Sequence, residues 1–365
     1  MKIIGPIAGI GSRLRPFTLS KPKAFIRVAG KTVLDHILTK FSQSFDLNTE
    51  LVLIVGYKKR QIIEYINKYY NDKFKLTFIQ QIPRGYSDNI PYYWGLGEAV
   101  YLAHKSFKNI RIDKPDDEKR EGALIFLGDM ILLDDYSYVM KRYHKSDVDG
   151  IITVMEVPKE DASSYGVVEI DKNNLITNLI EKPEIYVSNL AIAGIYAFSY
   201  STVQALFNNI KKYLDKRTEN SKEIYLTESM QDLVDSGFKI AAVELKKGIL
   251  DFGRPSEVLS GNQFLLEHLS NNQEATNNLK VLIERSFIKN PNHIGKNTKI
   301  INSVIGPYVS IGKNCNINNS ILKSCVIEDD TELINVISEN SIIGSYVKVE
   351  NISKDNLIIG DRSIY

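Results

Sequence analysis

The chain has 365 residues and a formal net charge of +2, with 46 lysines and arginines against 44 aspartates and glutamates. This length suits two domains better than one, and the balanced charge argues against a nucleic acid or a membrane surface as partner. The longest apolar runs, such as 123–127, are too short to span a bilayer, and no signal-peptide pattern is visible at the start. The two cysteines, Cys315 and Cys325, have no metal-ligand spacing, which is typical of a protein of the reducing cytoplasm.

The first pattern in the chain is an apolar start, a glycine-bearing loop at 7–18 and an amphipathic segment at 32–45. Gly9 and Gly11 lack a Cβ, so their backbone amides can approach an anion closely. Arg13, Arg15 and Lys23 add the positive charge that a polyphosphate needs. Two better-known phosphate loops are excluded, because Leu14 stands where a dinucleotide fingerprint has its third small residue and no Gly-Lys-Ser/Thr run exists.

From residue 1 to about 255, apolar runs alternate with helical patterns. The runs at 51–55, 76–79 and 123–127 predict buried strands, and the spacing at 59–70 and 98–106 predicts helices. This alternation is typical of a doubly wound α/β sheet, which binds its ligand beyond the carboxyl ends of the strands.

Two segments interrupt this alternation. Residues 82–94 carry two prolines, several aromatic residues and the single tryptophan, which predicts a loop, and the charged segment 109–122 predicts a surface excursion. From about 150 the runs at 150–157, 166–170, 175–180 and 193–198 predict further strands with less helix between them.

The last third of the chain has a different hydrophobic pattern. A polar helical bridge is predicted at 257–278, and from Ile294 onward isoleucines recur at intervals of about six residues. Two similar segments, starting at Asn302 and Asn319, lie seventeen residues apart, close to one three-sided coil of a hexapeptide β-helix. We therefore predict domains at 1–255 and 286–365 with a linker at 256–285. The isoleucine rungs suit self-association, so we expect a homo-oligomer.

The string from Ala8-Gly9 through Gly11-Ser12-Arg13-Leu14 to Pro22-Lys23 resembles the signature of sugar-1-phosphate nucleotidylyltransferases. Nearly the whole chain resembles the long-form glucose-1-phosphate thymidylyltransferases, which carry a C-terminal β-helix. This resemblance implies a Rossmann-like nucleotidyltransferase sheet and a left-handed hexapeptide β-helix. It also implies Mg²⁺ as cofactor, with dTTP or UTP and glucose-1-phosphate as substrates.

Two aspartates are candidate metal ligands. Asp129 follows the apolar run 123–127, so it is placed at the carboxyl edge of the predicted sheet. A carboxylate there suits Mg²⁺, which takes one or two carboxylates together with substrate phosphates. Asp251 matches the family's second metal position.

The resemblance also assigns binding and catalytic residues. The nucleotide is expected at Ala8, Gly9, Gly11, Ser12, Arg13, Gln80, Gln81, Gly95, Leu96 and Gly128. The sugar phosphate is expected at Tyr165, Gly166, Glu181, Lys182, Ala193 and Gly194. The family has its base-contacting glutamine closer to the Gly95-Leu96 segment, so the choice between Gln80 and Gln81 stays open.

The implied reaction is a direct displacement that needs no activating base. A phosphate monoester has its second pKa near about 6, so the sugar phosphate is already largely dianionic at neutral pH. Catalysis would then rest on alignment and charge: Arg13 on the leaving pyrophosphate, Lys23 and Mg²⁺ (held by Asp129) on the developing charge, and Lys182 on the nucleophile.

Two alternatives stay open. A bifunctional enzyme that also acetylates amino-sugar phosphates would use the β-helix, but that segment has only His293 as a candidate general base. A non-catalytic regulatory homologue would be expected to lose a charged site residue. The sequence keeps all five that are expected, namely Arg13, Lys23, Asp129, Lys182 and Asp251.

Overall fold

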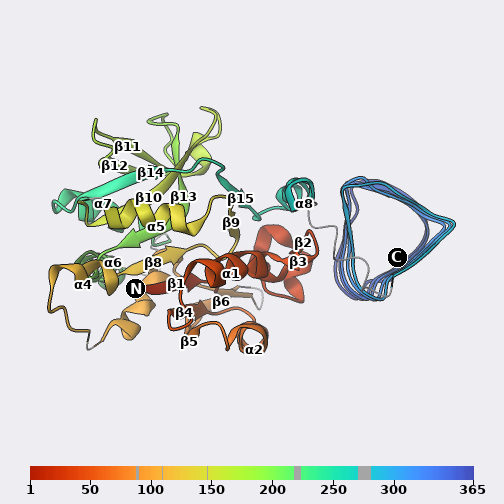
Figure 1. Ribbon diagram of the computed structural model, residues 1–365, viewed down its shortest axis with the longest axis horizontal. Coiled ribbons are helices and arrows are strands. Elements are labelled where there is room, and N and C mark those ends of the chain that lie inside the picture. The colour runs from red at the N-terminus through yellow and green to blue at the C-terminus, as the bar shows by residue number, and fades with distance from the viewer. Residues whose placement is uncertain (88–89, 109, 146, 218–222, 270–280) are drawn as a thin grey trace. The chain divides into compact units, whose positions relative to one another are not determined.

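The computed structural model describes residues 1–365 apart from 88–89, 109, 146, 218–222 and 270–280. The chain forms two compact units (Figure 1), the first made of residues 1–9 and 37–249 and the second of residues 10–36 and 250–365. The domain boundaries at 255 and 285 remain predictions. None of the described helices combines the length and the apolar character needed to cross a membrane.

A mixed sheet forms the centre of the first unit, in the order β12-β11-β13-β8-β1-β4-β5, with β10 pairing with both β13 and β14. The strands are β1 (Lys2–Pro6), β4 (Glu50–Val55), β5 (Lys75–Gln80), β8 (Ala123–Phe126), β10 (Gly150–Glu156), β11 (Gly166–Ile170), β12 (Ile176–Glu181), β13 (Leu190–Phe198) and β14 (Ile240–Glu244). Strands β8, β1, β4 and β5 run parallel, whereas β13 runs antiparallel to β8. The doubly wound Rossmann-like core predicted from the sequence is confirmed.

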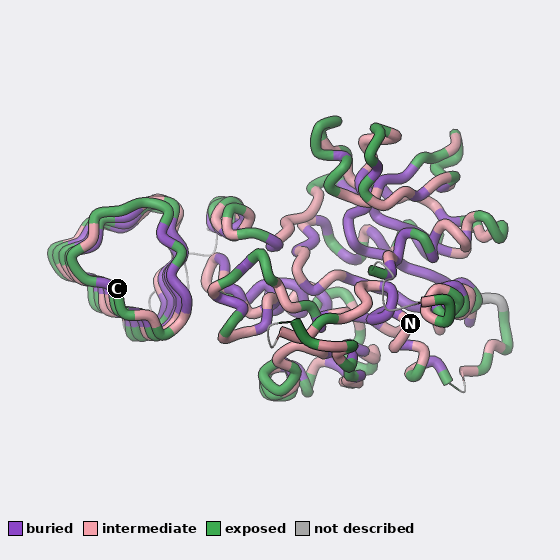
Figure 2. The backbone as a smooth tube through the Cα atoms, turned by 180° about the vertical axis from the view of Figure 1, so that it is seen from behind, coloured by how far each residue is buried: buried purple, intermediate pink, exposed green. Residues whose placement is uncertain are grey.

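Helices cover both faces of this sheet. They are α1 (Val33–Ser44), α2 (Lys59–Tyr70), α3 (Leu96–Leu102), α4 (Pro115–Arg120), α5 (Tyr136–Lys145), α6 (Tyr200–Asp215) and α7 (Leu226–Asp235). On one face α3, α6 and α7 share a buried apolar cluster with Ile4 and Ile125. On the other, the ring of Phe41 in α1 lies 4.8 Å from Phe126 and 4.3 Å from Tyr136. Successive strand residues therefore face opposite helical layers, as the alternation of side chains along a strand requires. Figure 2 shows the buried segments running along these strands.

Three sequence-based expectations need correction. The segment 82–94 contains a short hairpin, β6 (Gly85–Ser87) paired with β7 (Ile90–Tyr92), rather than only loop. The charged segment 109–122, expected as a surface excursion, contains the short helix α4. The helix expected at 98–106 begins earlier, at Leu96, and continues as a 3₁₀ helix over Ala103–Phe107.

The second unit contains the N-terminal loop, defined here as residues 10–32. This loop holds three 3₁₀ turns, Ser12–Leu14, Phe17–Leu19 and Lys23–Phe25, and the short strands β2 (Arg27–Val28) and β3 (Lys31–Thr32). Helix α8 (Pro255–Leu269) begins two residues before the bridge predicted at 257–278 and covers its first part, whereas 270–278 falls outside the described residues. Strand β15 (Ile249–Asp251) stands where the chain passes from the first unit to the second, and the short strand β9 (Met130–Leu132) belongs to the first unit.

The rest of the second unit is a β-helix, seen end-on as stacked three-sided coils in Figure 1. Its strands are β16 (Leu282–Glu284), β17 (Phe287–Ile288), β18 (Asn292–Ile294), β19 (Lys299–Ile301), β20 (Val304–Ile305), β21 (Val309–Ile311), β22 (Asn316–Asn318), β23 (Ile321–Lys323), β24 (Val326–Ile327), β25 (Glu332–Glu339), β26 (Ile342–Ile343), β27 (Lys348–Ser353) and β28 (Ile358–Ile359). Parallel pairing stacks Ile300, Ile317, Leu333 and Val349 in one buried row. The predicted β-helix is confirmed.

Asparagines explain how the coils turn their corners. Asn302, Asn319, Asn335 and Asn351 all have positive φ, between 49° and 59°. Asparagine tolerates this left-handed region better than most residues. Their side chains also form a ladder, with amide-to-carbonyl distances of 3.1, 3.2 and 2.7 Å from coil to coil. The corner residue therefore supplies both the turn and a bond to the next coil.

Candidate active site

Three chain segments converge at the carboxyl ends of β1 and β8 in the first unit. Gly128-Asp129 follow β8, and Ala8-Gly9 follow β1. A Cβ on Gly128 would lie 2.3 Å from Cγ2 of Ile7, so the two strand ends can approach only because this residue is glycine. Since Ile195 pairs with Phe126, Ala193-Gly194 lie at the same edge of the sheet. Gly194 has a φ of 75°, and a Cβ there would lie 2.7 Å from the sulfur of Met130.

The expected sugar-phosphate residues extend this edge across β11 and β12. Gly166 pairs with Glu181, and the backbone N–H of Lys182 donates to the carbonyl of Tyr165 at 3.0 Å. Thr227 donates its hydroxyl to Glu181 at 2.6 Å, while Nζ of Lys182 lies 3.4 Å from the other oxygen of that carboxylate. The Lys182 side chain is 48% exposed and has a backbone φ of 43°. An accessible ammonium group is thus held beside a carboxylate at the sheet edge.

Tyr196 of β13 adds a buried hydroxyl beside this group. Burial, and then the neighbouring Glu181, raise the pKa of Tyr196 well above its ordinary value, because both disfavour the phenolate. The hydroxyl therefore keeps its proton throughout the neutral range. Tyr196 lies two residues after Gly194 on β13, although it is not among the sugar-phosphate residues expected above.

The two candidate glutamines have different surroundings. Gln81 is 2% exposed and donates its amide nitrogen to Glu98 at 2.7 Å. Gln80 is exposed and accepts a bond from Lys59 at 2.6 Å. The amide of Gln81 is therefore already hydrogen-bonded inside the first unit, whereas Gln80 is open to solvent.

Glu98 is a residue that sequence reasoning missed. It is buried in the first turns of α3, where it accepts bonds from Nε of Arg84 at 2.7 Å and from the backbone of Trp94 at 3.1 Å. Arg84 also lies over the Trp94 ring, 4.1 Å from its centroid. Glu98 therefore ties both ends of the 82–94 segment to the helix that begins at Leu96. In the sequence, the only feature that marks Glu98 is its charge within the otherwise apolar start of a helix.

Gly95 and Leu96, expected at the base, lie at the start of the same helix. Gly95 has a φ of 93°, and a Cβ there would lie 2.2 Å from Cγ of Glu223. The backbone of the next glycine, Gly97, donates to the carbonyl of Ile224 at 3.0 Å. Glycine is required at position 95 both for the backbone angle and for the close approach of this neighbouring segment.

The second unit contains the remaining expected residues, beginning with Gly11, Ser12 and Arg13. Gly11 has a φ of 68°, and a Cβ there would lie 2.9 Å from Thr18 and 3.0 Å from Lys23. Thr18 also donates its hydroxyl to the carbonyl of Gly11 at 2.8 Å. The loop is thus closed on itself by packing, with Ser12 and Arg13 exposed.

Lys23 and Asp251 lie close together within the second unit. A Cβ on Gly253 would lie 3.5 Å from Oδ1 of Asp251 and 3.7 Å from Nζ of Lys23. The backbone N–H of Gly253 donates to Glu257 at 2.8 Å, which adds a carboxylate that sequence reasoning missed. Among the residues that the structure describes, no group of three or more His, Cys, Asp or Glu side chains is arranged to hold a metal ion.

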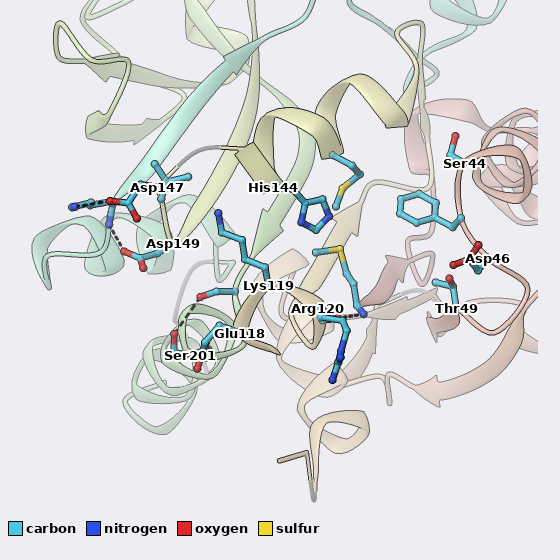
Figure 3. A pocket seen from close by; sticks show the side chains of 16 residues that line it. Ser44, Asp46, Thr49, Glu118, Lys119, Arg120, His144, Asp147, Asp149 and Ser201 are labelled. Carbon is cyan, nitrogen blue, oxygen red and sulfur yellow. Dashed lines mark hydrogen bonds and ion pairs between the residues drawn. The ribbon is translucent and has the colours of Figure 1, made fainter. Parts of the chain in front are cut away.

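A cavity of about 770 Å³ lies elsewhere, near the amino ends of β1 and β10 (Figure 3). It is lined by a mixture of charges that includes Lys119, Asp149 and His144. Burial, and then the neighbouring Lys119, lower the pKa of His144. None of the residues expected from the sequence lines this cavity.

Comparison with known proteins agrees with these observations. The family described as Nucleotidyl transferase matches residues 7–268 of the chain. A protein named bifunctional protein GlmU from Methanocaldococcus jannaschii is 30% identical, over 97% of this chain and 86% of its own length. The UTP–glucose-1-phosphate uridylyltransferase AglF of Haloferax volcanii is 32% identical, over 73% of this chain and 97% of its own length.

A solved structure supports the fold alone. The UDP-glucose pyrophosphorylase from Acinetobacter baumanii superimposes with a TM-score of 0.56 at 21% identity, covering 75% of this chain and 96% of that one. Together with the family match over most of the chain, these findings confirm the resemblance drawn from the glycine loop. The chain therefore belongs to the nucleotidyl transferase family of enzymes.

Proposed function

We propose that this protein transfers a nucleotidyl group from dTTP or UTP to glucose-1-phosphate, releasing pyrophosphate and forming dTDP-glucose or UDP-glucose. The observation that carries the proposal is the sheet edge of the first unit, where Asp129, Gly194 and Lys182 follow or flank adjoining strands. The family match and the named activity of the Haloferax relative support the same reaction class.

In the proposed reaction an oxygen of the sugar phosphate attacks the α-phosphorus, and the bond to pyrophosphate breaks. The half-exposed Lys182 holds the phosphate that carries the nucleophile, and Glu181 accepts bonds from sugar hydroxyls. The exposed Arg13 and the half-buried Lys23 hold the triphosphate, so that charge on the leaving pyrophosphate is neutralised as it develops. These roles need positioned charges and no general base.

We further propose Mg²⁺ as the cofactor, held by Asp129 and Asp251. Both supply the hard carboxylate oxygens that Mg²⁺ prefers, and substrate phosphates and water would complete its ligands. When bound, it neutralises charge on the phosphates.

The base site is proposed at Ala8-Gly9, Gly95-Leu96 and a glutamine. Gln80 is the better candidate, because Gln81 is buried and already donates its amide nitrogen to Glu98. An amide can pair with O4 and N3–H of a pyrimidine, and a site that loses such pairing rejects the wrong base strongly. The thymine methyl group contributes only about 1–3 kcal/mol in an apolar pocket, so both dTTP and UTP are expected to react.

The test is pyrophosphate release measured over a matrix of nucleoside triphosphates and sugar phosphates. We expect turnover of dTTP and UTP with glucose-1-phosphate at rates within a few tenfold of each other, and weak use of ATP and GTP. A clear preference for a purine triphosphate would contradict the base site. No turnover with any pair would favour a non-catalytic regulatory homologue instead.

A bifunctional enzyme is the second candidate, because the Methanocaldococcus relative that spans 97% of this chain is named bifunctional. Acetyl transfer to an amino-sugar phosphate would need a general base in the β-helix. His293 is poorly suited, since a Cβ on Gly30 would lie 2.3 Å from its Nε2, which leaves no room for a substrate on that side. Consumption of acetyl-CoA in the presence of glucosamine-1-phosphate would establish this second activity.

We also propose that the protein is a homo-oligomer of the cytoplasm assembled through the β-helix. Register stacks the exposed side chains of Phe287, Val304, Ile321 and Ile337 in one row on its outer face. Burying such a row against a second copy would remove apolar surface from water. Light scattering should show a larger assembly for the full wild-type chain than for its Ile321→Lys variant.

A further inference from the structure

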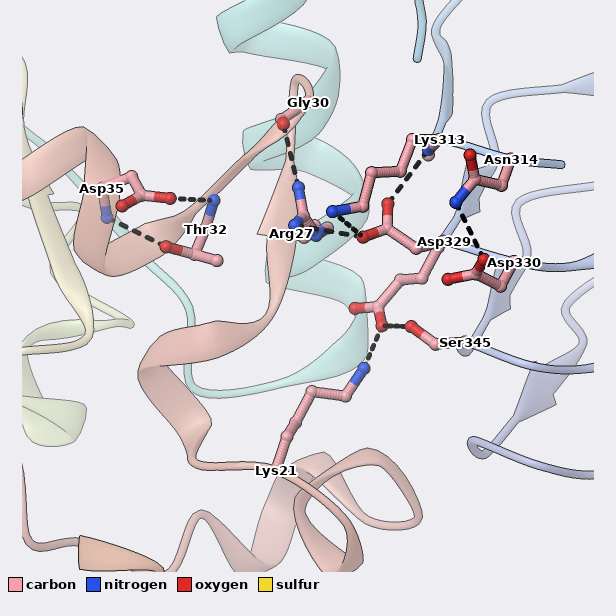
Figure 4. Close-up of polar contacts among 12 residues, drawn as sticks. Lys21, Arg27, Gly30, Thr32, Asp35, Lys313, Asn314, Asp329, Asp330 and Ser345 are labelled. Atoms are coloured by element: carbon pink, nitrogen blue, oxygen red, sulfur yellow. Dashed lines mark hydrogen bonds and ion pairs between the residues drawn. The ribbon is translucent and has the colours of Figure 1, made fainter. Parts of the chain in front are cut away.

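The β-helix contacts the N-terminal loop through ion pairs that are shielded from water (Figure 4). The ammonium of Lys21 pairs with the carboxylate of Glu328 and, at 2.9 Å, with Asp361. The side chains of Lys21 and Glu328 are only 12% and 3% exposed. Ser20 donates its hydroxyl to Asp361 at 2.5 Å. A buried carboxylate is costly unless it is paired, so this arrangement holds the loop firmly.

A second ion pair lies farther along the loop. Arg27 pairs with Asp329 at 3.2 Å and donates to the carbonyl of Gly30 at 3.2 Å. Asp329 also accepts a bond from the backbone of Lys313 at 3.0 Å, within the β-helix itself. The loop is thus tied to the β-helix both before and after Lys23.

Glu328 departs from the repeat of its own β-helix. Parallel register aligns Ile311, Ile327, Ile343 and Ile359 in successive coils. The residue after the isoleucine is Gly312, Gly344 and Gly360 in three of these coils, but Glu328 in the fourth. Turning this corner therefore does not require a glutamate. Its carboxylate instead accepts bonds from Lys21 and, at 3.0 Å, from Ser345.

Direct packing brings the loop against the same corner. A Cβ on Gly360 would lie 2.9 Å from Cβ of Pro16, so the loop rests on the coil at a distance that only glycine permits. Lys21 follows this contact and is joined to Lys23 through Pro22, whose ring fixes its φ near the observed −60°. Any displacement of Lys21 is therefore passed directly to the backbone of Lys23.

We propose that Glu328 and Asp361 are positioning residues for nucleotidyl transfer, acting through Lys21 on Lys23. The inference rests on the proposed function, in which Lys23 holds the triphosphate. Reacting groups displaced by about 1 Å can lose about 100-fold in rate. The β-helix thereby becomes part of the machinery that sets turnover, in addition to any role in assembly.

The decisive variant is Glu328→Gln in the full chain, which keeps the shape of the side chain and removes its charge. We expect faster hydrogen–deuterium exchange in peptides covering residues 10–25, and a fall in kcat of about tenfold or more with a much smaller change in KM for glucose-1-phosphate. The matched control is Glu339→Gln, whose partner Lys323 lies 2.6 Å away on the exposed surface of the same β-helix. The control should exchange and turn over as the wild type does.

Several outcomes would overturn the proposal. Loop exchange equal to the wild type in Glu328→Gln would show that the ion pair does not order the loop, and faster exchange with unchanged kcat would remove the positioning role. Should Glu328→Gln fail to fold, Ser20→Ala, which removes the hydroxyl that bonds Asp361 at 2.5 Å and the carbonyl of Phe17 at 2.9 Å, decides by the same two measurements. If the wild type shows no nucleotidyl transfer, the proposed function fails, and the exchange comparison still decides whether the β-helix orders the loop.

Discussion

Two lysines show how differently the two units use charge. Lys182, at the sheet edge of the first unit, is 48% exposed and lies 3.4 Å from a single carboxylate. Lys21, in the second unit, is 12% exposed and is held by two carboxylates. The first ammonium keeps the access to solvent that a phosphate ligand requires. The ammonium of Lys21 instead holds the N-terminal loop against the β-helix.

The same contrast exists between two aspartates of the first unit. Asp129 is half-buried at the carboxyl end of β8. Asp134 is buried and accepts three backbone bonds, from Lys246 at 3.2 Å, Lys247 at 2.8 Å and Gly248 at 3.2 Å. Burial, rather than residue type, thus separates an aspartate that solvent can reach from one that holds the fold.

Asp129→Asn should have the largest effect on turnover. If Asp129 holds Mg²⁺, the variant should fold normally while kcat falls by orders of magnitude, because metal-mediated charge stabilisation contributes several kcal/mol and about 1.4 kcal/mol is tenfold in rate. Circular dichroism and steady-state kinetics check the two halves of this prediction. Asp134→Asn should do the reverse and lower the melting temperature first. A folded Asp129→Asn protein with near-normal turnover would remove Asp129 from the metal site.

Lys21→Met should have the largest effect on stability. The substitution leaves Glu328 and Asp361 buried without their cation, and breaking a buried pair in this way costs about 3–5 kcal/mol. Thermal and denaturant unfolding measure the loss, and Lys323→Met, which removes an exposed pair on the same β-helix, serves as the control. Equal melting temperatures for the two variants would mean that burial does not distinguish these pairs.

Periodic signals in the sequence predicted most of the fold. The isoleucine interval predicted the β-helix because each coil must bury one apolar rung, and Ile300, Ile317 and Leu333 do so. Helix α4 was not predicted, because its residues are nearly all charged and form no apolar stripe. The hairpin β6–β7 was missed because a proline and exposed tyrosines hide the alternation that marks a strand.

Residues of the candidate site could be predicted from the sequence only where they directly follow a strand. Asp129 could be placed because a continuous apolar run precedes it, whereas Glu98 and Glu257 could not, since a glutamate in a helix is usually a solvated surface residue. The pairing of Lys21 with Glu328 joins positions 307 residues apart. No local pattern carries such a contact, so only the folded chain reveals it.

Lys182→Ala should sharpen the contrast with Lys21. Because it removes a charge-assisted bond to the nucleophile's own phosphate, KM for glucose-1-phosphate should rise far more than KM for the triphosphate, by about ten- to a hundredfold. The melting temperature should stay close to that of the wild type, since the side chain is half exposed and has one weak ion pair. Equal changes in both KM values would contradict the assigned role.

His293 should give the smallest effect, a pH dependence of stability confined to the second unit. Burial, and then the neighbouring Arg27, lower the pKa of His293 from its ordinary value of 6.5, although Asp329 opposes the shift. The unfolded chain therefore takes up a proton before the folded one does, so stability present above pH 6.5 is lost as the pH falls below that value. Melting temperatures between pH 8 and pH 5, within about the range in which histidine titrates, should fall less steeply for His293→Gln than for the wild type. The exposed His268, changed to Gln, should leave the slope unaltered, and parallel slopes for all three proteins would mean that His293 is not the group that titrates.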